Sequence, residues 1–236
     1  MKFIGVDGCK IGWFFVGLNG NGGWDIGVVP RISKLSEAIK ASELTLVDIP
    51  IGLRERESQE RLCDLSARKV LGKRRSSVFP APCRLAINCD TYEEGSKVNY
   101  KYTGRKLAKQ SWAIAAKIKE VDELLQDEDM KGKVREIHPE ICFWALNKRR
   151  EMEHSKKRPE GIKQRQTVLS KYCQLTDEII NRALEKYLRK EVAKDDIIDG
   201  LVGAVTATFS DILVTLPKEP EIDAKGLAME MVYARL

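Results

Sequence analysis

The sequence predicts an α/β fold in which a mixed sheet of three antiparallel strands plus parallel strands is flanked by helices. Two observations carry this prediction. The chain opens with three short runs rich in aromatic and β-branched residues, at 2–7, 13–18 and 24–29, and a Gly/Asn-rich turn separates the last two. A near-continuous apolar run at 44–49 then follows an amphipathic segment, which is typical of a buried parallel strand reached through a helical crossover.

The other elements follow from periodicity and from turn residues. Ile32, Leu35 and Ile39 recur at helical spacing in the crossover, and a basic stretch around 58–72 is also helical in character. Two prolines in the loop at 74–84 exclude a central strand there. The remainder is expected to form a long amphipathic helix at 107–125, a strand at 133–137 and a short helix at 141–146. Two further helices at 176–190 and 195–214 and a last edge strand at 229–235 complete the prediction.

Composition and organisation predict one globular domain over 1–236, with a helical insertion around 145–194. Hydrophobic residues make up 43% and charged residues 32% of the chain, and no repeat or linker divides it. The polar stretch at 148–165 is expected to be mobile. The chain contains no run of 18 apolar residues and begins without a cleavable apolar stretch, so we expect no membrane association and a cytoplasmic location. The sequence carries no signal for an oligomeric state.

The cysteines and histidines do not predict a zinc site. The chain has six Cys without a C-x-x-C pair and only two His, whereas tetrahedral zinc sites need such ligands clustered at short spacing. Any metal would be held by oxygen ligands, which favours Mg²⁺ or Mn²⁺.

The positive charge is concentrated in two segments. The chain carries a net charge of +6, but residues 51–84 hold nine basic against four acidic residues, and residues 145–165 hold eight against three. Such local stretches predict a surface that attracts anions, although two solvated helix faces would also account for them.

Two aspartates break the apolar pattern of the predicted strands. Asp7 comes at the end of the first strand, and Asp48 lies within the apolar run of the crossover strand. A carboxylate in a buried strand is costly unless it is paired or bound to a metal, and local rules tend to fail at functional sites. The alternative is that each accepts backbone N–H groups in a turn.

The late helix adds a second pair of acids. Asp196 and Asp199 are three residues apart and therefore project from one face, and the small residues that follow let this helix lie close to a sheet. The alternative is that Asp195 is the N-cap of this helix and that Asp196 and Asp199 only interact favourably with the dipole of its first turn. Glu136, in the predicted strand at 133–137, and Glu140 are further acids near a strand end.

Carboxylates that converge from two strands and a helix suit a two-magnesium site for phosphodiester cleavage, because such ions activate water and stabilise the leaving oxygen. The sequence has no P-loop, no dinucleotide-binding glycine motif and no nucleophile elbow.

The order of elements and the positions of the acids resemble the ribonuclease H-like superfamily and, more closely, the DUF429 family of predicted nucleases within it. The motifs that carry the resemblance run nearly end to end: GVDGCKIGW (5–13), VDIPIGL (47–53), CDLSARKVLGKRRSSVFPAPCR (63–84), KIKEVD (117–122), EIHPEICF (136–143), KKRPEGIKQR (156–165) and DDIIDGLVGAVTA (195–207). The resemblance implies that Asp7 sits centrally and that Asp48 matches the acid at the end of the fourth strand. It also implies that Asp196 and Asp199 match the acidic pair on the last helix of resolvase-like members.

The leading hypothesis is a magnesium- or manganese-dependent nuclease that acts on DNA or RNA. Asp7 would bridge both metal ions, Asp48 and Asp199 would each hold one, and Asp196 or Glu136 would complete the set.

The basic loop before Pro80 supplies candidate substrate contacts. Arg74, Arg75, Ser76 and Ser77 would grip backbone phosphates. The rival interpretation is that an arginine of this loop pairs internally with an acid such as Asp64.

Two other functions remain open at this point. A non-catalytic nucleic-acid or protein-binding module on the same fold would bind metal without turnover. An actin- or sugar-kinase-like phosphotransferase also has a first strand with a similar Asp, but those proteins duplicate the fold, and 236 residues without a repeat hold only one half.

Overall fold

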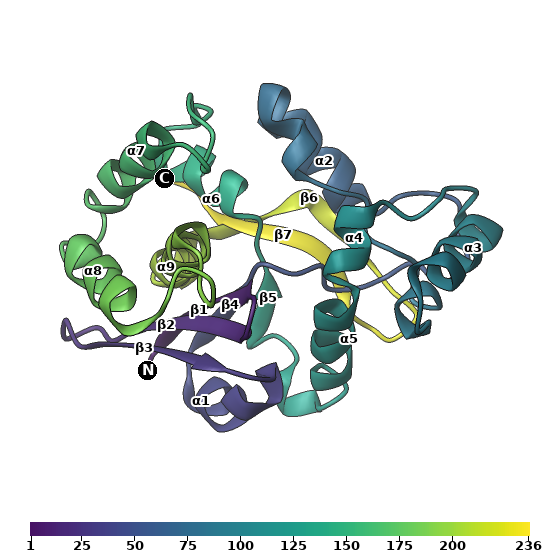
Figure 1. Cartoon of the computed structure of the whole chain (residues 1–236), viewed down its shortest axis with the longest axis horizontal. Helices are drawn as coiled ribbons and strands as arrows, with labels where there is room; N and C mark the ends of the chain where they lie inside the picture. Colours follow the sequence, from purple (N-terminus) through teal and green to yellow (C-terminus); the bar gives the residue numbers. More distant parts are fainter.

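The computed structural model describes residues 1–236 and has a five-stranded mixed sheet at its centre (Figure 1). Its strands lie in the order β3-β2-β1-β4-β5. They span Phe3–Cys9 (β1), Gly12–Leu18 (β2), Trp24–Val29 (β3), Leu44–Val47 (β4) and Val134–Glu136 (β5). The first three strands are antiparallel, and β4 and β5 continue the sheet in parallel with β1. The predicted fold class is confirmed, and the architecture is consistent with a ribonuclease H-like fold.

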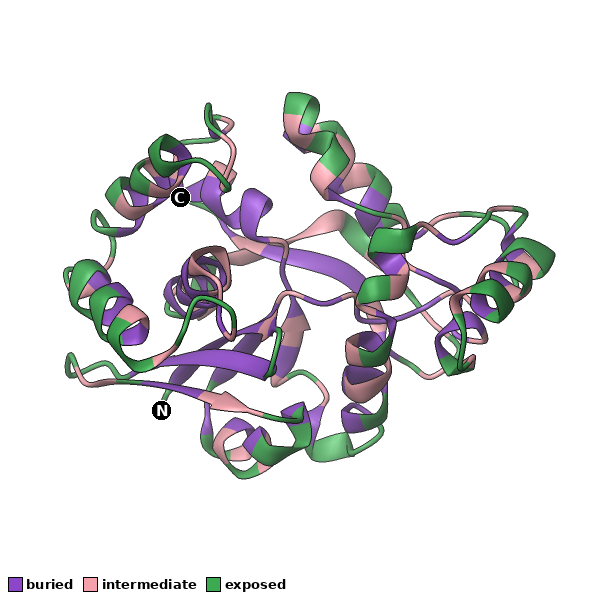
Figure 2. Cartoon of the chain, viewed as in Figure 1, coloured by how far each residue is buried: buried purple, intermediate pink, exposed green.

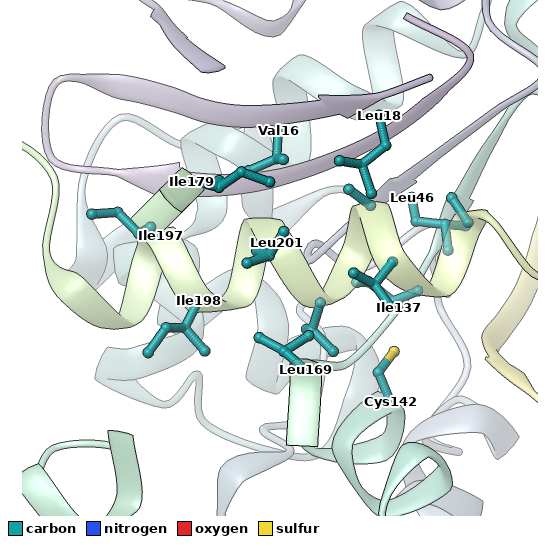
Figure 3. Packing of buried hydrophobic residues seen from close by; sticks show 14 of the residues in the cluster. Val16, Leu18, Leu46, Ile137, Cys142, Leu169, Ile179, Ile197, Ile198 and Leu201 are labelled. Carbon is teal, nitrogen blue, oxygen red and sulfur yellow. The ribbon is translucent and has the colours of Figure 1, made fainter. Parts of the chain in front are cut away.

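Both faces of the sheet are covered, which explains the near-continuous apolar strands (Figure 2). Alternation along β2 sends Phe14, Val16 and Leu18 to one face and Trp13 and Phe15 to the other. The first face packs against α9 (Lys194–Ala207), with Val16, Leu18 and Leu46 lying along this helix in Figure 3. The second packs against the crossover, a 3₁₀ turn at Ile32–Leu35 followed by α1 (Ser36–Ala41), and against α5 (Ala115–Leu124).

The end of the chain differs from the prediction. The helix expected at 195–214 stops at Ala207, and the residues from Leu213 form β6 (Leu213–Ile222), which pairs antiparallel with β7 (Ala228–Ala234) in a separate two-stranded sheet. The predicted last strand therefore exists, but it is not an edge of the main sheet. The hairpin packs instead on α2 (Leu62–Leu71) and α6 (Pro139–Leu146) through buried side chains that include Ala67, Ile141 and Met231.

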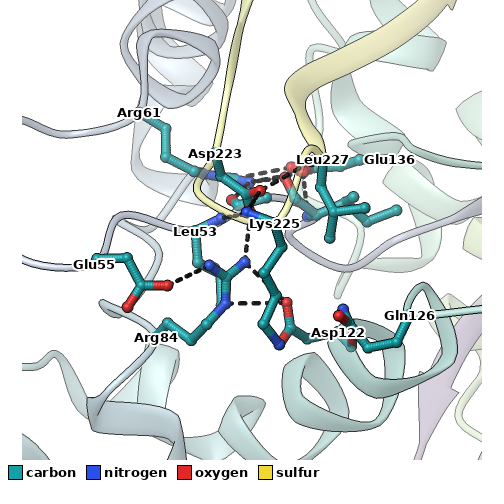
Figure 4. Close-up of polar contacts among 12 residues, drawn as sticks. Leu53, Glu55, Arg61, Arg84, Asp122, Gln126, Glu136, Asp223, Lys225 and Leu227 are labelled. Atoms are coloured by element: carbon teal, nitrogen blue, oxygen red, sulfur yellow. Dashed lines mark hydrogen bonds and ion pairs between the residues drawn. The ribbon is translucent and has the colours of Figure 1, made fainter. Parts of the chain in front are cut away.

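Buried ion pairs tie the turn of this hairpin to the body of the protein (Figure 4). The Arg84 guanidinium contacts Asp223 in the turn and lies 3.0 Å from Asp122 of α5 and 2.5 Å from Glu55. Lys225 Nζ lies 2.7 Å from the other oxygen of Asp122. The turn is thereby fixed against α5 and the loop that follows β4.

The remaining helices only partly match the predicted ranges. The long helix expected at 107–125 is broken at Ile114 into α4 (Lys109–Ala113) and α5, and α3 (Tyr92–Thr103) was not predicted. The polar 148–165 segment, expected to be mobile, is helical from Pro159 onward. The helix begins at this proline, a residue that the first turn of a helix accommodates. The other helices and 3₁₀ turns are α7 (Pro159–Leu169), α8 (Thr176–Lys186), Gly72–Ser77, Ala86–Asn88, Glu128–Met130 and Ser210–Ile212. None of the helices combines the length and the apolar character that crossing a bilayer requires.

Candidate metal centre

Three carboxylates from three elements meet at one end of the sheet. One oxygen each of Asp7, Asp48 and Asp199 lies within 4.8 Å of the others. Asp7 and Asp48 are neighbours because β1 and β4 are parallel with Val6 opposite Val47, and the Asp48 N–H donates to the Val6 carbonyl at 3.0 Å. Asp199 joins them because α9 lies directly over β1. The structure thus brings together the three residues predicted to hold metal.

Burial leaves this carboxylate trio short of hydrogen-bond donors. Asp199 is 1% exposed and Asp7 9%, and Asp48 is half-buried. Asp7 Oδ1 accepts the Gly8 N–H at 2.6 Å, whereas Asp199 Oδ1 is buried without any partner. Buried polar atoms are rarely left unpaired, so this oxygen is available to accept a hydrogen bond or to bind a cation.

The proton affinities of the trio are strongly perturbed. Desolvation by burial, followed by repulsion from Asp48 and Asp199, raises the pKa of Asp7 well above its ordinary value. Burial and the charge of Asp199 raise the pKa of Asp48 to about 8, and burial also raises the pKa of Asp199. Three like charges in a desolvated corner resist ionisation together, and a bound cation would relieve this.

One lysine faces the trio. Lys156 Nζ lies 2.6 Å from Asp199 Oδ2 and 3.9 Å from the nearer oxygen of Asp195. Burial acts to lower the pKa of Lys156, but the charges of Asp199, Asp7 and Asp48 more than offset it, so the pKa lies above its ordinary value. Lys156 is therefore an ammonium ion at neutral pH.

The segment that carries Lys156 is held by a fully buried arginine. Arg165, on α7, pairs with Glu140 and donates to the carbonyls of His154 at 3.1 Å and Gly161 at 2.9 Å. Glu140, predicted near the site, thus acts through Arg165, which fixes the backbone two residues before Lys156.

Asp196 lies beside the trio but has its own partner. Its Oδ2 accepts the Ala193 N–H at 2.8 Å, and α9 begins at Lys194 with Ala193 as its cap. The alternative in which Asp195 is the N-cap is wrong, because this position already lies inside the first turn. Burial raises the pKa of Asp196 to about 6 despite the Ala193 hydrogen bond.

Glu136 is not brought to the trio. Its two oxygens accept hydrogen bonds from Arg61 at 2.8 and 3.0 Å, and Oε2 also accepts the Ile51 N–H at 2.6 Å (Figure 4). The same guanidinium pairs with Asp64 at 2.5 Å. Burial raises the pKa of Glu136 to about 7, although the charge of Arg61 opposes the shift. Arg61 is thus shared between Glu136 and Asp64, and these two acids, with Cys63, form a second cluster that is separate from the trio.

The carboxylate trio opens into a cleft of about 680 Å³. Its walls include Asp7, Asp48, Glu136 and Glu140 from the predicted acids, and Arg74, Ser76 and Ser77 from the predicted phosphate-binding loop. Arg75 is exposed and is not part of the lining. Arg74 does not pair with Asp64; its Nε donates to the Met152 carbonyl at 2.9 Å.

Five basic side chains that the sequence did not single out also line the cleft: Arg61, Lys117, His138, Lys156 and Lys157. Lys117 Nζ lies 4.6 Å from the centroid of the Trp13 ring and donates to the Gly12 carbonyl at 2.5 Å. His138 Nε2 lies 3.2 Å from the Ser77 carbonyl oxygen, and burial lowers the pKa of this imidazole. The basic runs signalled anion binding, but not which of their members turn inward.

Comparisons with known proteins place the chain in a family without assigning an activity. A family model described as "Protein of unknown function (DUF429)" matches residues 5–222. No curated protein and no solved structure matches the chain significantly.

Proposed function

This chain belongs to the DUF429 family, and we propose that it is a divalent-metal-dependent nuclease of the ribonuclease H-like superfamily that hydrolyses phosphodiester bonds of nucleic acid. The observation that carries the proposal is the carboxylate trio of Asp7, Asp48 and Asp199, which includes a buried, unpartnered oxygen and opens into a cleft with basic walls.

The trio fits a hard divalent cation. All of its donors are carboxylate oxygens, which Mg²⁺ and Mn²⁺ prefer, and Asp199 Oδ1 lacks the partner that a buried oxygen requires. Asp7, Asp48 and Asp199 would hold the ion. A metal bound there supplies an activated water and stabilises charge on the leaving oxygen. Asp196 and Glu136 act from outside the trio, because each is occupied by the partner described above.

The rest of the cleft suits a phosphate backbone. Arg74, Lys117 and Lys157 offer positive charge, and Ser76 and Ser77 offer hydroxyl groups, all from elements that flank the trio. A cleft of about 680 Å³ has the size of pockets that enclose small molecules, so it accommodates nucleotides of a single strand rather than an intact duplex. The substrate is therefore single-stranded DNA or RNA, or a strand end.

The test is a cleavage assay with the full chain in Mg²⁺ or Mn²⁺, using single-stranded and duplex DNA and RNA of the same sequence. We expect cleavage of the single strands, its loss in EDTA, and a loss of at least 100-fold in Asp7→Asn. Glu219→Gln, at an exposed position of β6, should match the wild type. Metal binding without cleavage of any of these substrates would instead identify a non-catalytic binding module.

A further inference from the structure

The carboxylate trio already has a cation of its own. Lys156 Nζ contacts Asp199 Oδ2 at 2.6 Å, and its charge acts on Asp7 and Asp48 as well. It comes from the 148–158 stretch between α6 and α7, far in sequence from all three acids. An ammonium group in this position has the electrostatic effect of a bound monovalent ion.

The position of Lys156 is built into the fold. Arg165 is fully buried and fastens the His154 carbonyl to Glu140. The backbone of the following residue, Ser155, packs directly on Gly161 of α7. There is no room for a side chain between them, because a Cβ on Gly161 would lie 2.0 Å from the Ser155 carbonyl oxygen. The backbone is thus held at the two residues that precede Lys156. This positions the Lys156 ammonium group beside the trio instead of letting it move freely on the surface.

Charge balance decides how many divalent ions such a site accepts. The ionised trio carries three negative charges, and Lys156 reduces this to two, which one divalent ion neutralises. Two divalent ions beside Lys156 would leave two uncompensated positive charges in a desolvated corner, which is costly. The balance counts only the trio and the lysine in direct contact with it: Asp195 and Asp196 are partly exposed, so solvent screens their charges, and Glu136 shares Arg61 with Asp64.

We propose that the site holds one divalent ion and that Lys156 acts as the second cation, in place of the second metal ion of a two-metal centre. The inference rests on the proposed nuclease function. Lysine is a compact point charge that serves well as a phosphate ligand, so Lys156 both limits the metal content and faces the phosphate of the substrate. It is a binding residue that the two-metal expectation from the sequence did not include.

Stoichiometry tests the proposal directly. The full chain is titrated calorimetrically with Mn²⁺, alone and with a single-stranded phosphorothioate hexanucleotide, so that an ion that binds only beside substrate is also counted. We expect one ion in the wild type and in Lys156→Arg, and two in Lys156→Met, with the first binding about tenfold more tightly than in the wild type. Electron paramagnetic resonance should show isolated Mn²⁺ in the wild type and a spin-coupled pair in Lys156→Met.

Lys157→Met is the matched control, because the neighbouring lysine also lines the cleft but contacts none of the trio, and it should bind one ion. If Lys156→Met does not fold, Lys156→Gln takes its place. Two ions in the wild type, or one ion in folded Lys156→Met or Lys156→Gln, would overturn the inference and leave the nuclease proposal intact. Absence of Mn²⁺ binding to the wild type would overturn both.

Discussion

Gly5 of β1 and Gly203 of α9 meet with their backbones in direct contact. A Cβ on Gly203 would lie 3.1 Å from the Gly5 Cα, and a Cβ on Gly5 would lie 2.1 Å from both the Ala204 nitrogen and the Gly200 carbonyl oxygen. The helix therefore rests on the strand without intervening side chains. This close approach is what carries Asp199 to within reach of Asp7.

Replacing Gly5 by Ala should destabilise the protein by about 3 kcal/mol, because the added methyl group has only backbone to displace. Urea unfolding followed by circular dichroism measures the change. Gly20→Ala is the control, since a Cβ there meets nothing within 4 Å, and it should unfold like the wild type. Equal stability of Gly5→Ala and Gly20→Ala would show that α9 does not lie on β1 as described.

Asp7→Asn should raise the unfolding free energy without metal at pH 8 by on the order of 1 kcal/mol, because it removes a buried carboxyl group whose ionisation is opposed by burial and by its acidic neighbours. The same substitution should abolish Mn²⁺ binding in calorimetry. Asp90→Asn, at an exposed position, should change neither quantity. A loss of several kcal/mol in Asp7→Asn would mean that Asp7 is a structural hydrogen-bond acceptor.

Stability without metal should fall as the pH rises from 6.5 to 8. Asp48 and Glu136 have pKa values raised to about 8 and about 7, so in this window the folded state holds protons that the unfolded state has already lost. His138 has a lowered pKa and acts in the opposite direction, but only below its ordinary value of 6.5.

Thermal unfolding across this pH range, with and without 10 mM Mg²⁺, checks the sign. Mg²⁺ should stabilise the protein more at pH 8 than at pH 6.5, because it binds the ionised trio. Asp48→Asn should flatten the metal-free profile. A metal-free profile that rises with pH in the wild type would contradict the raised pKa values.

Arg74→Ala should reduce the slope of log affinity against log salt for a single-stranded oligonucleotide by about 0.7 per lost phosphate contact. Arg75→Ala is the matched control, because Arg75 is exposed and lies outside the cleft lining. Fluorescence anisotropy at several salt concentrations gives the slopes, and circular dichroism verifies folding, since Arg74 also holds the Met152 carbonyl. Equal slopes for both variants would remove Arg74 from the binding surface.

The sequence allowed the main sheet and the carboxylate trio to be predicted because both depend on strong local signals. Alternation and turn residues mark the strands, and an Asp in an apolar strand is conspicuous. The partners of Glu136 and Asp199 are Arg61 and Lys156, which are distant in the chain and lie in basic segments where no residue stands out. Pairings of this kind depend on tertiary packing.

The secondary-structure differences have similar causes. β6 runs through the sequence LPKEPEI, whose prolines and charges argue against a strand, but it belongs to a two-stranded hairpin that tolerates them. The α3 helix is largely polar and therefore lacks the apolar periodicity on which the prediction relied.

The late position of α9 and of the hairpin fastened by Arg84 has a consequence for the protein's synthesis. A ribosome releases Asp7 and Asp48 well before Asp199 and the strands packed on α2 and α6, and one face of the main sheet stays bare until α9 arrives. A nascent chain therefore has two acids and neither a full ligand set nor an enclosing wall. Under the proposed function, the messenger and ribosomal RNA around an unfinished chain never meet an active enzyme.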